Sequence, residues 1–387
     1  MAASGIPGGT RGARSMGAPV APGFLTRLAA QRPRADVQRA IAELYAGRPV
    51  IVTDRDHAPR LAMPIDGLTP AILDDLRGIA AGPLELVVSA TRAARLGAEG
   101  MRSATMRLPA SVTDRRILEL VAGAEVGECG PLARGDHVCD AAIELAKLAR
   151  LLPAVLSMPV PEGALAKDLL QVRAIDALAF RDGQADTLRR VSSAPVPMRA
   201  ALDCELTVFR DELGESWSMI RVGLPDTRAT VPVRLHSACL TGDAFASLRC
   251  DCGDQLQMAL ATIDALGGGL LLYLTQEGCG IGLANKMRAY RLQDEGLDTI
   301  DANTTLGFER DERRYEAAAQ MLRSAGFERV ALLTNNPSKV DALRAAGIDV
   351  RERIPLLAPV RGGNRRYLET KSRRAGHLIG DTTVPGT

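Results

Sequence analysis

VPVRLHSACLTGDAFASLRCDCG occupies residues 231–253 and contains Cys239, Cys250 and Cys252, three of the seven cysteines of the chain. Thiolates at this spacing are typical of a zinc site, and three protein ligands leave one coordination position open for water. A zinc ion with an open position can activate that water for attack on a bound substrate. The spacing therefore predicts metal-assisted hydrolysis.

Two other interpretations of these cysteines are a set of buried apolar thiols and a disulfide. The polar neighbours Arg249, Asp251 and Gly253 indicate a turn rather than a core strand. The close Cys-x-Cys spacing also suits chelation of one ion better than it suits a disulfide. We favour the metal site.

The overall composition predicts a two-domain protein that works in a reducing cytoplasm. The chain has 387 residues, a net charge of +2 and 3% aromatic residues, so it lacks the basic surface and the stacking residues of a nucleic-acid binder. The seven cysteines are scattered, unlike those of a secreted disulfide scaffold. No segment is apolar for long enough to suggest a membrane span. Residues 1–34 lack the apolar core of a signal peptide and are expected to form a disordered leader.

Hydrophobic spacing predicts an α/β first domain over residues 35–190. Val37, Ile41 and Leu44 recur at helical spacing, and the apolar run 50–52 follows as a short strand. Further helices are expected over 140–151 and 169–180. The polar, proline-bearing segment 182–198 indicates a domain boundary.

The second domain, residues 191–387, begins with two alternating runs at 204–209 and 217–222 that predict a β-hairpin. Helices and strands then alternate. Helices are expected around 256–263 and 315–324, and strands at 270–274 and 330–333. The predicted fold class is α/β (mixed α+β), with two domains that each contain a mixed sheet and packed helices.

Three later segments carry polar residues at element ends. The glycine-rich turn at 276–286 can offer backbone N–H groups to an anion, the run 305–315 carries Asp311 and Arg313 near a helix start, and the strand end at 333–339 is followed by Lys339. Each signal is weak by itself. Taken separately, they fit an ordinary turn, a solvated helix end and a loop.

The order of these segments resembles the GTP cyclohydrolase II family over residues 193–380. The resemblance is carried by His-Ser-x-Cys-Leu-Thr-Gly-Asp, Ser-Leu-Arg-Cys-Asp-Cys-Gly, Gln-Glu-Gly followed by Ile-Gly-Leu-x-Asn-Lys, Arg-Ala-Tyr-x-Leu-Gln-Asp and Leu-Leu-Thr-Asn-Asn-Pro. This resemblance implies a zinc enzyme that opens the imidazole ring of GTP in the first step of riboflavin biosynthesis. The expected products are formate, pyrophosphate and 2,5-diamino-6-(5-phospho-ribosylamino)pyrimidin-4-one.

The same resemblance implies roles for individual residues. Cys239, Cys250 and Cys252 would hold one zinc ion per subunit, whose water attacks C8 of guanine. Tyr290 would lie near the reacting base, and Asp311 would accept a proton. Arg313 matches a residue proposed to act at the α-phosphate, where we expect it to serve as a cation because arginine stays protonated. The expected GTP contacts are Arg234, Leu235, His236, Ser237, Gln255, Glu277, Gly278, Cys279, Thr299, Thr334 and Lys339, with Mg²⁺ on the triphosphate.

Two positions depart from the family pattern. Cys279 stands where the family usually has arginine, and Ala238 stands where it has glutamate. Loss of one charged phosphate contact weakens binding by roughly 1.5–3 kcal/mol, so we expect a raised KM for GTP. Cys279 is open to three interpretations: a fourth zinc ligand, a reactive thiol, or a small residue that fills a turn, which we favour.

The N-terminal region resembles 3,4-dihydroxy-2-butanone 4-phosphate synthase, through the segments at 47–54 and 140–149. The acidic loop of that family is replaced by Arg-Asp-His-Ala-Pro-Arg-Leu-Ala-Met at 55–63, and its histidine is displaced to His137. Without these ligands a metal site cannot form, so we expect no synthase activity and a solvent-facing His137.

The leading hypothesis is therefore a cytoplasmic, homodimeric GTP cyclohydrolase II that binds neither nucleic acid nor membrane. One alternative is a related enzyme that acts on another purine or stops at the formylated intermediate, as Cys279 and Ala238 suggest. The other is a nucleotide-binding regulator without turnover.

Overall fold

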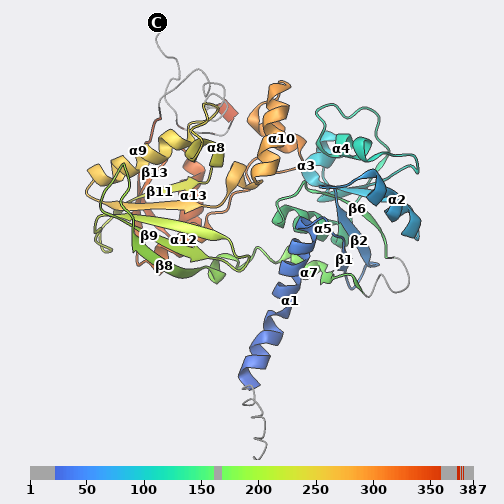
Figure 1. Cartoon of the computed structure of the whole chain (residues 1–387), viewed down its shortest axis with the longest axis horizontal. Coiled ribbons are helices and arrows are strands. Elements are labelled where there is room, and N and C mark those ends of the chain that lie inside the picture. The colour runs from blue at the N-terminus through green and yellow to red at the C-terminus, as the bar shows by residue number, and fades with distance from the viewer. Residues whose placement is uncertain (1–21, 161–167, 359–372, 375, 377, 379–387) are drawn as a thin grey trace, which may run out of the picture.

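The computed structural model describes residues 22–160, 168–358, 373, 374, 376 and 378. Two seven-stranded sheets lie side by side with helices packed on them (Figure 1), which confirms the predicted α/β class. Residues 1–21 of the expected leader lie outside the described residues. Residues 22–34 belong to the first helix, α1 (Pro22–Tyr45), rather than to a leader.

The first sheet has the order β5-β4-β3-β6-β2-β1-β7. Its neighbours are antiparallel, except that β1 and β7 run parallel. The strands are β1 (Val50–Thr53), β2 (Arg60–Pro64), β3 (Glu85–Ser89), β4 (Ser103–Arg107), β5 (Leu132–Arg134), β6 (Ala154–Pro159) and β7 (Gln171–Arg173). The other helices of this half are α2 (Pro70–Ile79), α3 (Ala90–Arg95), α4 (Asp114–Ala122), α5 (His137–Leu148) and α7 (Ala174–Leu178).

Helix α5 is the central helix of this half. Its N-cap Asp136 accepts a hydrogen bond from the Cys139 amide at 2.9 Å, and its small apolar face, including Ala141 and Leu145, is buried in the core that also holds strand β1. The helix predicted over 169–180 is wrong in part, because residues 171–173 form β7 and α7 covers only five residues. Pairing of β7 with β1 overrides the local helical pattern there.

The second sheet has the order β14-β13-β11-β12-β10-β9-β8. Strands β11 to β14 are parallel, whereas β8, β9 and β10 join antiparallel, so the predicted hairpin is confirmed as β9 and β10. The strands are β8 (Arg189–Pro195), β9 (Cys204–Arg210), β10 (Ser216–Val222), β11 (Val231–Ser237), β12 (Gly269–Leu274), β13 (Arg329–Leu333) and β14 (Asp349–Ile354). The helical elements are η1 (Ala185–Thr187), α8 (Leu240–Asp243), α9 (Cys252–Ala265), η2 (Glu277–Gly280), α10 (Leu283–Asp294), α11 (Thr299–Thr305), α12 (Glu316–Ser324) and α13 (Pro337–Ala345).

Strand β12 shows how this sheet is covered on both faces. Leu270, Leu272 and Leu274 join one buried cluster with α12 and α13, whereas Leu271 joins another with α9. Because successive side chains point to opposite faces, a run of leucines fits a strand buried on both sides. The carboxyl ends of the parallel strands β11, β12 and β13 therefore meet at one edge.

The segment 281–308 leaves the second sheet and packs into the core of the first. Ile281, Leu292 and Phe308 are at most 3% exposed and belong to the same cluster as Leu61 and Leu86 of the N-terminal sheet. In Figure 1, α10 accordingly lies between the two sheets. The two halves are thus joined by a shared hydrophobic core as well as by the chain.

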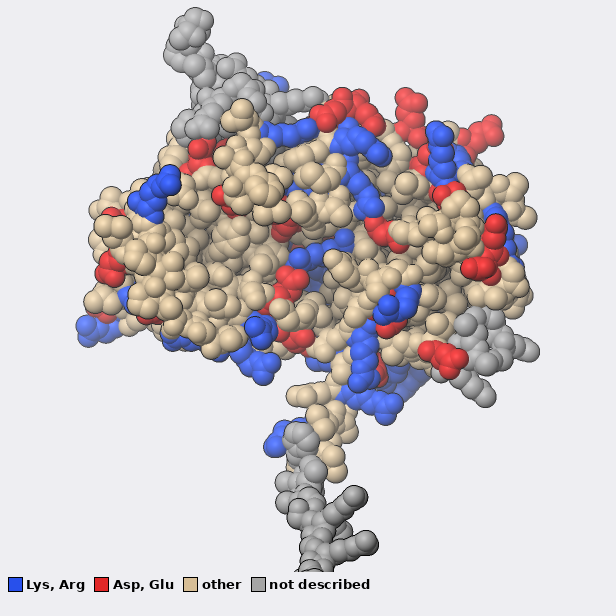
Figure 2. Space-filling view, viewed as in Figure 1, with Lys and Arg blue, Asp and Glu red and all other residues tan. Residues whose placement is uncertain are grey.

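Acidic and basic side chains alternate over the face shown in Figure 2, as the near-neutral net charge of +2 suggests. None of the described helices is both long and apolar enough to cross a membrane.

Candidate active site

The three cysteines of 231–253 lie together at the carboxyl edge of the second sheet. Cys239 follows β11, and Cys250 and Cys252 lie at the start of α9. Their Sγ atoms are within 4.8 Å of one another, and those of Cys239 and Cys250 are 3.6 Å apart. A disulfide would require about 2.05 Å, whereas two thiolates on one tetrahedral zinc ion lie about 3.8 Å apart. The cluster fits a zinc ion.

Gly242 permits this close approach of the sulfur atoms. A Cβ atom on Gly242 would lie 2.8 Å from Cys250 Sγ and 3.1 Å from Cys239 Sγ. At position 242 the backbone therefore lies directly against the thiols, and no side chain larger than that of glycine fits there.

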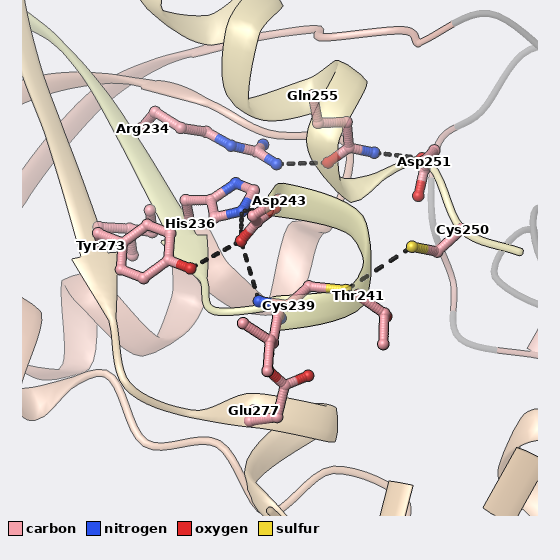
Figure 3. Close-up of polar contacts among 12 residues, drawn as sticks. Arg234, His236, Cys239, Thr241, Asp243, Cys250, Asp251, Gln255, Tyr273 and Glu277 are labelled. Atoms are coloured by element: carbon pink, nitrogen blue, oxygen red, sulfur yellow. Dashed lines mark hydrogen bonds and ion pairs between the residues drawn. The ribbon is translucent and has the colours of Figure 1, made fainter. Parts of the chain in front are cut away.

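A buried polar network holds the Cys239 turn in place (Figure 3). The Asp243 carboxylate accepts hydrogen bonds from the Cys239 amide at 2.9 Å and from the Tyr273 hydroxyl at 2.8 Å, and both of its oxygens lie 3.1 Å from His236 Nε2. The His236 ring also stacks on Tyr273, with ring centroids 5.5 Å apart. Burial lowers the pKa of His236 despite the adjacent carboxylate.

Lys286 supplies positive charge beside the cluster. Its Nζ atom lies 3.1 Å from Cys239 Sγ, 3.0 Å from Thr241 Oγ1 and 2.8 Å from Glu277 Oε1. Burial opposes its charge, but the hydrogen bonds to Glu277 and Cys239 outweigh burial and raise the pKa of Lys286. Hydrogen bonds from Cys250, Cys252 and Lys286 lower the pKa of Cys239, whereas the contact with Cys239 raises the pKa of Cys250. In the absence of metal, the thiolate is therefore favoured at Cys239.

One cavity brings most of the predicted residues together. It is lined by the three cysteines and by residues from four other segments, including helix α10 and the loop before α12. The predicted residues that line it are Ser237, Cys239, Cys250, Cys252, Glu277, Gly278, Cys279, Tyr290, Thr299 and Arg313.

Arg313 and Asp311 form an ion pair at this cavity. Arg313 Nε lies 2.8 Å from Asp311 Oδ1, and the side chains are 15% and 41% exposed. Burial would raise the pKa of Asp311, but the hydrogen bonds and charge of Arg313 lower it. Burial would lower the pKa of Arg313, yet the neighbouring Cys279, Tyr315 and Asp311 raise it. Both groups are therefore ionised at neutral pH.

A second group of predicted residues lies along the strand ends, beside the cavity. Arg234 donates to the Leu333 carbonyl at 2.9 Å and to the Gln255 side chain, and Lys339 donates to the Leu235 carbonyl at 2.9 Å. Thr334 Oγ1 accepts from the Asn336 amide at 3.0 Å, so it shapes the turn into α13.

Three successive polar positions of β11 carry buried atoms with unused hydrogen-bonding capacity. Arg234 Nε, His236 Nδ1 and Ser237 Oγ have no hydrogen-bond partner among the described residues. An unsatisfied buried polar group costs about 1–3 kcal/mol, and such groups are found where a ligand completes the bonding. Leu235 differs, because its side chain is fully buried in the hydrophobic core and only its backbone can face a ligand.

Cys279 does not join the cluster of Cys239, Cys250 and Cys252. The described His, Cys, Asp and Glu side chains supply three ligand atoms within 4.8 Å of one another at this place, and Cys279 is not among them. Its backbone is left-handed, with φ of 60°, which favours glycine. Cys279 therefore occupies a strained turn position at the wall of the cavity, which disfavours its interpretation as a fourth metal ligand.

Sequence reasoning missed the roles of Asp243, Lys286 and Arg249. All three residues lie inside the motifs that we quoted, and this membership was the available signal. Arg249 covers the Tyr290 ring, with its Cζ atom 4.4 Å from the ring centroid, and pairs with Asp294 at 2.7 Å. Only the packing of α10 against the cysteine turn brings these residues together.

In the N-terminal half, His137 is exposed at the start of α5, as expected. His57 Nδ1 lies 2.6 Å from Asp54 Oδ2, and the ring centroids of His57 and His137 are 6.2 Å apart.

Comparison with known proteins identifies relatives over most of the chain. Residues 189–355 match the family model described as GTP cyclohydrolase II. A GTP cyclohydrolase-2 from Azospirillum brasilense is 42% identical over 372 residues, which cover 89% of this chain and 94% of that protein. One from Xylella fastidiosa (strain 9a5c) is 42% identical over 345 residues, or 88% and 86% of the two chains. The two-domain 3,4-dihydroxy-2-butanone 4-phosphate synthase RibBX from A. baumannii, a solved structure, has a TM-score of 0.31 and 17% identity, covering 84% of this chain and 99% of that one.

Proposed function

Because the chain belongs to the GTP cyclohydrolase II family, we propose that it hydrolyses GTP in a zinc-dependent reaction. The products would be formate, pyrophosphate and 2,5-diamino-6-(5-phospho-ribosylamino)pyrimidin-4-one. The observation that carries this proposal is the convergence of three cysteines, Tyr290 and Arg313 on one cavity.

The cysteine cluster suits zinc as the resident metal. Three thiolates are soft ligands that leave one position open, and the Lys286 ammonium offsets their negative charge. Bound there, zinc supplies a water molecule of lowered pKa that can attack a carbon atom such as C8 of guanine.

Asp311 and Arg313 would divide proton transfer and phosphate binding between them. In the structure, Arg313 neutralises Asp311 and lowers its pKa, which makes the carboxylate a weak base. When a phosphate draws the Arg313 guanidinium away, the pKa of Asp311 rises towards its ordinary value and the carboxylate accepts a proton more readily. Substrate binding would thus activate the base.

Tyr290 and Glu277 would orient the guanine. Burial raises the pKa of Tyr290, so its hydroxyl stays protonated and can donate a hydrogen bond. Glu277 accepts from Lys286 Nζ and from the Leu240 amide, one bond on each carboxylate oxygen. Each oxygen keeps a further lone pair for the N–H donors of guanine, which adenine lacks in that arrangement.

Arg234 and Lys339 would hold the triphosphate at the strand ends, with Mg²⁺ on its oxygens. Burial lowers the pKa of Arg234 to about 10, so it is cationic at neutral pH. The Nε atom of Arg234 and the Oγ atom of Ser237, which have no hydrogen-bond partner among the described residues, can both bond to the ligand. His236, Gln255, Thr299 and Thr334 would complete this binding surface.

The test is to incubate zinc-loaded protein with GTP and Mg²⁺, quantify formate and pyrophosphate, and identify the pyrimidine by mass. We expect equal amounts of both products together with the diaminopyrimidine. Pyrophosphate with a retained formyl group would instead support the shortened reaction that Cys279 and Ala238 suggest. An absence of turnover with zinc bound would favour the regulator.

Replacement of Cys250 by serine tests the metal site in the same assay. Cys250→Ser should lower the zinc content and abolish turnover, because serine is a poor zinc ligand at neutral pH. The control is Cys129→Ser, since Cys129 is exposed and lies outside the cluster. Full activity and undiminished zinc in Cys250→Ser would refute the assignment.

For the N-terminal half, we infer a scaffold without synthase activity, and we infer that the protein is a homodimer. Arg55, Asp56 and His57 are exposed where the synthase family has its acidic loop. Incubation with ribulose 5-phosphate and Mg²⁺ should give no dihydroxybutanone phosphate. Light scattering of the purified chain tests the dimer.

A further inference from the structure

The loop that carries Asp311 and Arg313 has no regular secondary structure. Helix α11 ends at Thr305 and α12 begins at Glu316, so the positions of residues 309–315 depend on individual contacts. Gln276 provides two of these contacts, since its side chain accepts from the Arg314 amide at 2.9 Å and donates to the Arg314 carbonyl at 2.6 Å. These bonds fix the C-terminal end of the loop.

The centre of the loop is fixed by Glu312, which lies between the two catalytic candidates. Its amide donates to the Cys279 carbonyl at 3.0 Å, and its Oε1 accepts from the Glu309 amide at 3.0 Å. The loop packs closely on the glycine-rich turn, because a Cβ atom on Gly280 would lie 2.9 Å from the carbonyl carbon of Glu312.

The charge partner of Glu312 comes from the other domain. Lys147, near the end of α5 in the N-terminal half, places its Nζ 2.7 Å from Glu312 Oε1, and both side chains are 13% exposed. Burial would raise the pKa of Glu312, but Lys147 outweighs burial and lowers it, so the carboxylate stays ionised. At this burial, an ion pair that loses one partner leaves an uncompensated charge.

Two other N-terminal residues hold the start of the same loop. Ser89 Oγ donates to the Gly307 carbonyl at 2.6 Å, and Thr91 Oγ1 donates to Glu309 Oε1 at 3.0 Å. Contacts from the N-terminal domain therefore reach from Gly307 to Glu312. They stop one residue short of Arg313.

We propose that Lys147 is a positioning residue for the cyclohydrolase reaction: through Glu312 it holds the loop 309–315 so that Asp311 and Arg313 face the substrate. The N-terminal domain, whose described residues contribute no side chain to the cavity lined by the cysteines, thereby completes the active site of the C-terminal domain. This inference rests on the proposed GTP hydrolysis.

Lys147→Ala in the full-length chain tests the proposal. We expect kcat for GTP to fall about tenfold to a hundredfold, as is typical when reacting groups are misplaced, while zinc content stays unchanged. Lys147→Arg should restore most of the activity, because the pair borders a cavity of about 420 Å³ that can take the longer side chain. A loss of kcat without rescue by arginine would overturn the assignment.

The matched control is Arg34→Ala. Arg34 also forms an ion pair between the halves, with its Nε 2.9 Å from Glu212 Oε2, but it makes no described contact with residues 309–315. This variant should keep the wild-type kcat. Equal losses in Lys147→Ala and Arg34→Ala would show that both pairs act only on overall stability, and would refute a positioning role.

A double variant tests whether Lys147 acts through Glu312. In the Glu312→Ala background, Lys147→Ala should cause less than a threefold further loss of kcat, because the contact between the two side chains is already absent. Independent, multiplying losses would contradict the proposal.

Amide hydrogen exchange separates this proposal from the proposed function. In Lys147→Ala without nucleotide, the amides of Glu309 and Glu312 should exchange faster than in wild type and Arg34→Ala. If wild type fails to hydrolyse GTP, the proposed function fails, while faster exchange still shows that Lys147 orders the loop. Unchanged exchange with active wild type would refute the role of Lys147 alone.

Discussion

Arg92, which is 1% exposed, donates from Nη1 to the Thr305 carbonyl at 2.7 Å and thereby joins α3 of the N-terminal half to the end of α11. Its other guanidinium nitrogens donate to the carbonyls of Leu120, Glu119 and Gly123 at 2.8 to 3.1 Å. No acidic group is among these partners. One buried cation thus satisfies carbonyls from both halves of the chain.

Replacement of Arg92 by methionine should destabilise the protein by about 3 kcal/mol, because two buried and two partly buried carbonyls lose a donor. Urea unfolding followed by circular dichroism measures this free energy. Arg95→Met is the control, since Arg95 is 35% exposed in its pair with Asp301, and should cost less than about 1 kcal/mol. Equal effects of the two variants would contradict a special role for Arg92.

Gly242→Ala should lower the affinity for zinc without unfolding the chain. The added methyl would lie 2.8 Å from Cys250 Sγ and 3.0 Å from Cys252 Cβ, so the thiols must move apart. Metal analysis after dialysis against a competing chelator gives the retained zinc. Gly78→Ala, in α2 with nothing within 4 Å of the new methyl, should keep wild-type zinc.

Cys279→Arg should lower the KM for GTP about tenfold or more, because a charged phosphate contact contributes roughly 1.5–3 kcal/mol. Cys279 lines the same cavity as Arg313, so the new guanidinium can reach the ligand. Steady-state kinetics at several GTP concentrations separate KM from kcat. Cys279→Gly is the control: it relieves the left-handed φ of 60° and should stabilise the fold by about 1 kcal/mol without improving KM. An unchanged KM in Cys279→Arg would show that this position does not face the phosphates.

The buried His236 should make stability fall with acidification below about pH 6.5. Burial lowers the pKa of His236 from its ordinary value of 6.5, so below that pH the unfolded chain binds a proton that the folded chain does not. The free energy of unfolding therefore decreases as pH falls, by at most about 1.4 kcal/mol per pH unit from this group. Below the lowered pKa of the folded state, this contribution stops changing.

Urea titrations of wild type and His236→Gln between pH 7.5 and 5.5 isolate this effect. Glutamine keeps a donor for Asp243 but does not titrate, so the slope of stability against pH should be smaller in the variant. Zinc release at acid pH affects both proteins and cancels in the difference. Parallel curves would refute the contribution of His236.

Much of the fold could be predicted because local patterns coincide with the tertiary contacts. The alternation at 204–209 and 217–222 predicted the hairpin β9 and β10, and the leucine run at 270–274 predicted β12. The prediction failed at 171–173, where pairing with β1 outweighs helical spacing. Propensity is a weak determinant in such short segments.

The cysteine cluster and the family could be predicted because their residues lie in short, contiguous motifs. Cys250 and Cys252 are two positions apart, and the spacing of close residues limits the geometry that the backbone can adopt. Asp243 and Lys286 were present in these motifs. Asp243 contacts Cys239 within the same turn, whereas the contact of Lys286 with Cys239 depends on how α10 packs against that turn.

The sequence by itself determined the family and the residues that we propose for the chemistry: three thiolates, a carboxylate, an arginine and a tyrosine. Only the tertiary structure decided which contacts between the two halves fix the positions of these residues. Lys147 and Glu312 are 165 positions apart, and Arg92 and Thr305 are 213 apart, so no local pattern links them. The shared hydrophobic core around Phe308 brings the two halves together. There, Lys147 neutralises Glu312, and Arg92 donates to carbonyls of both halves.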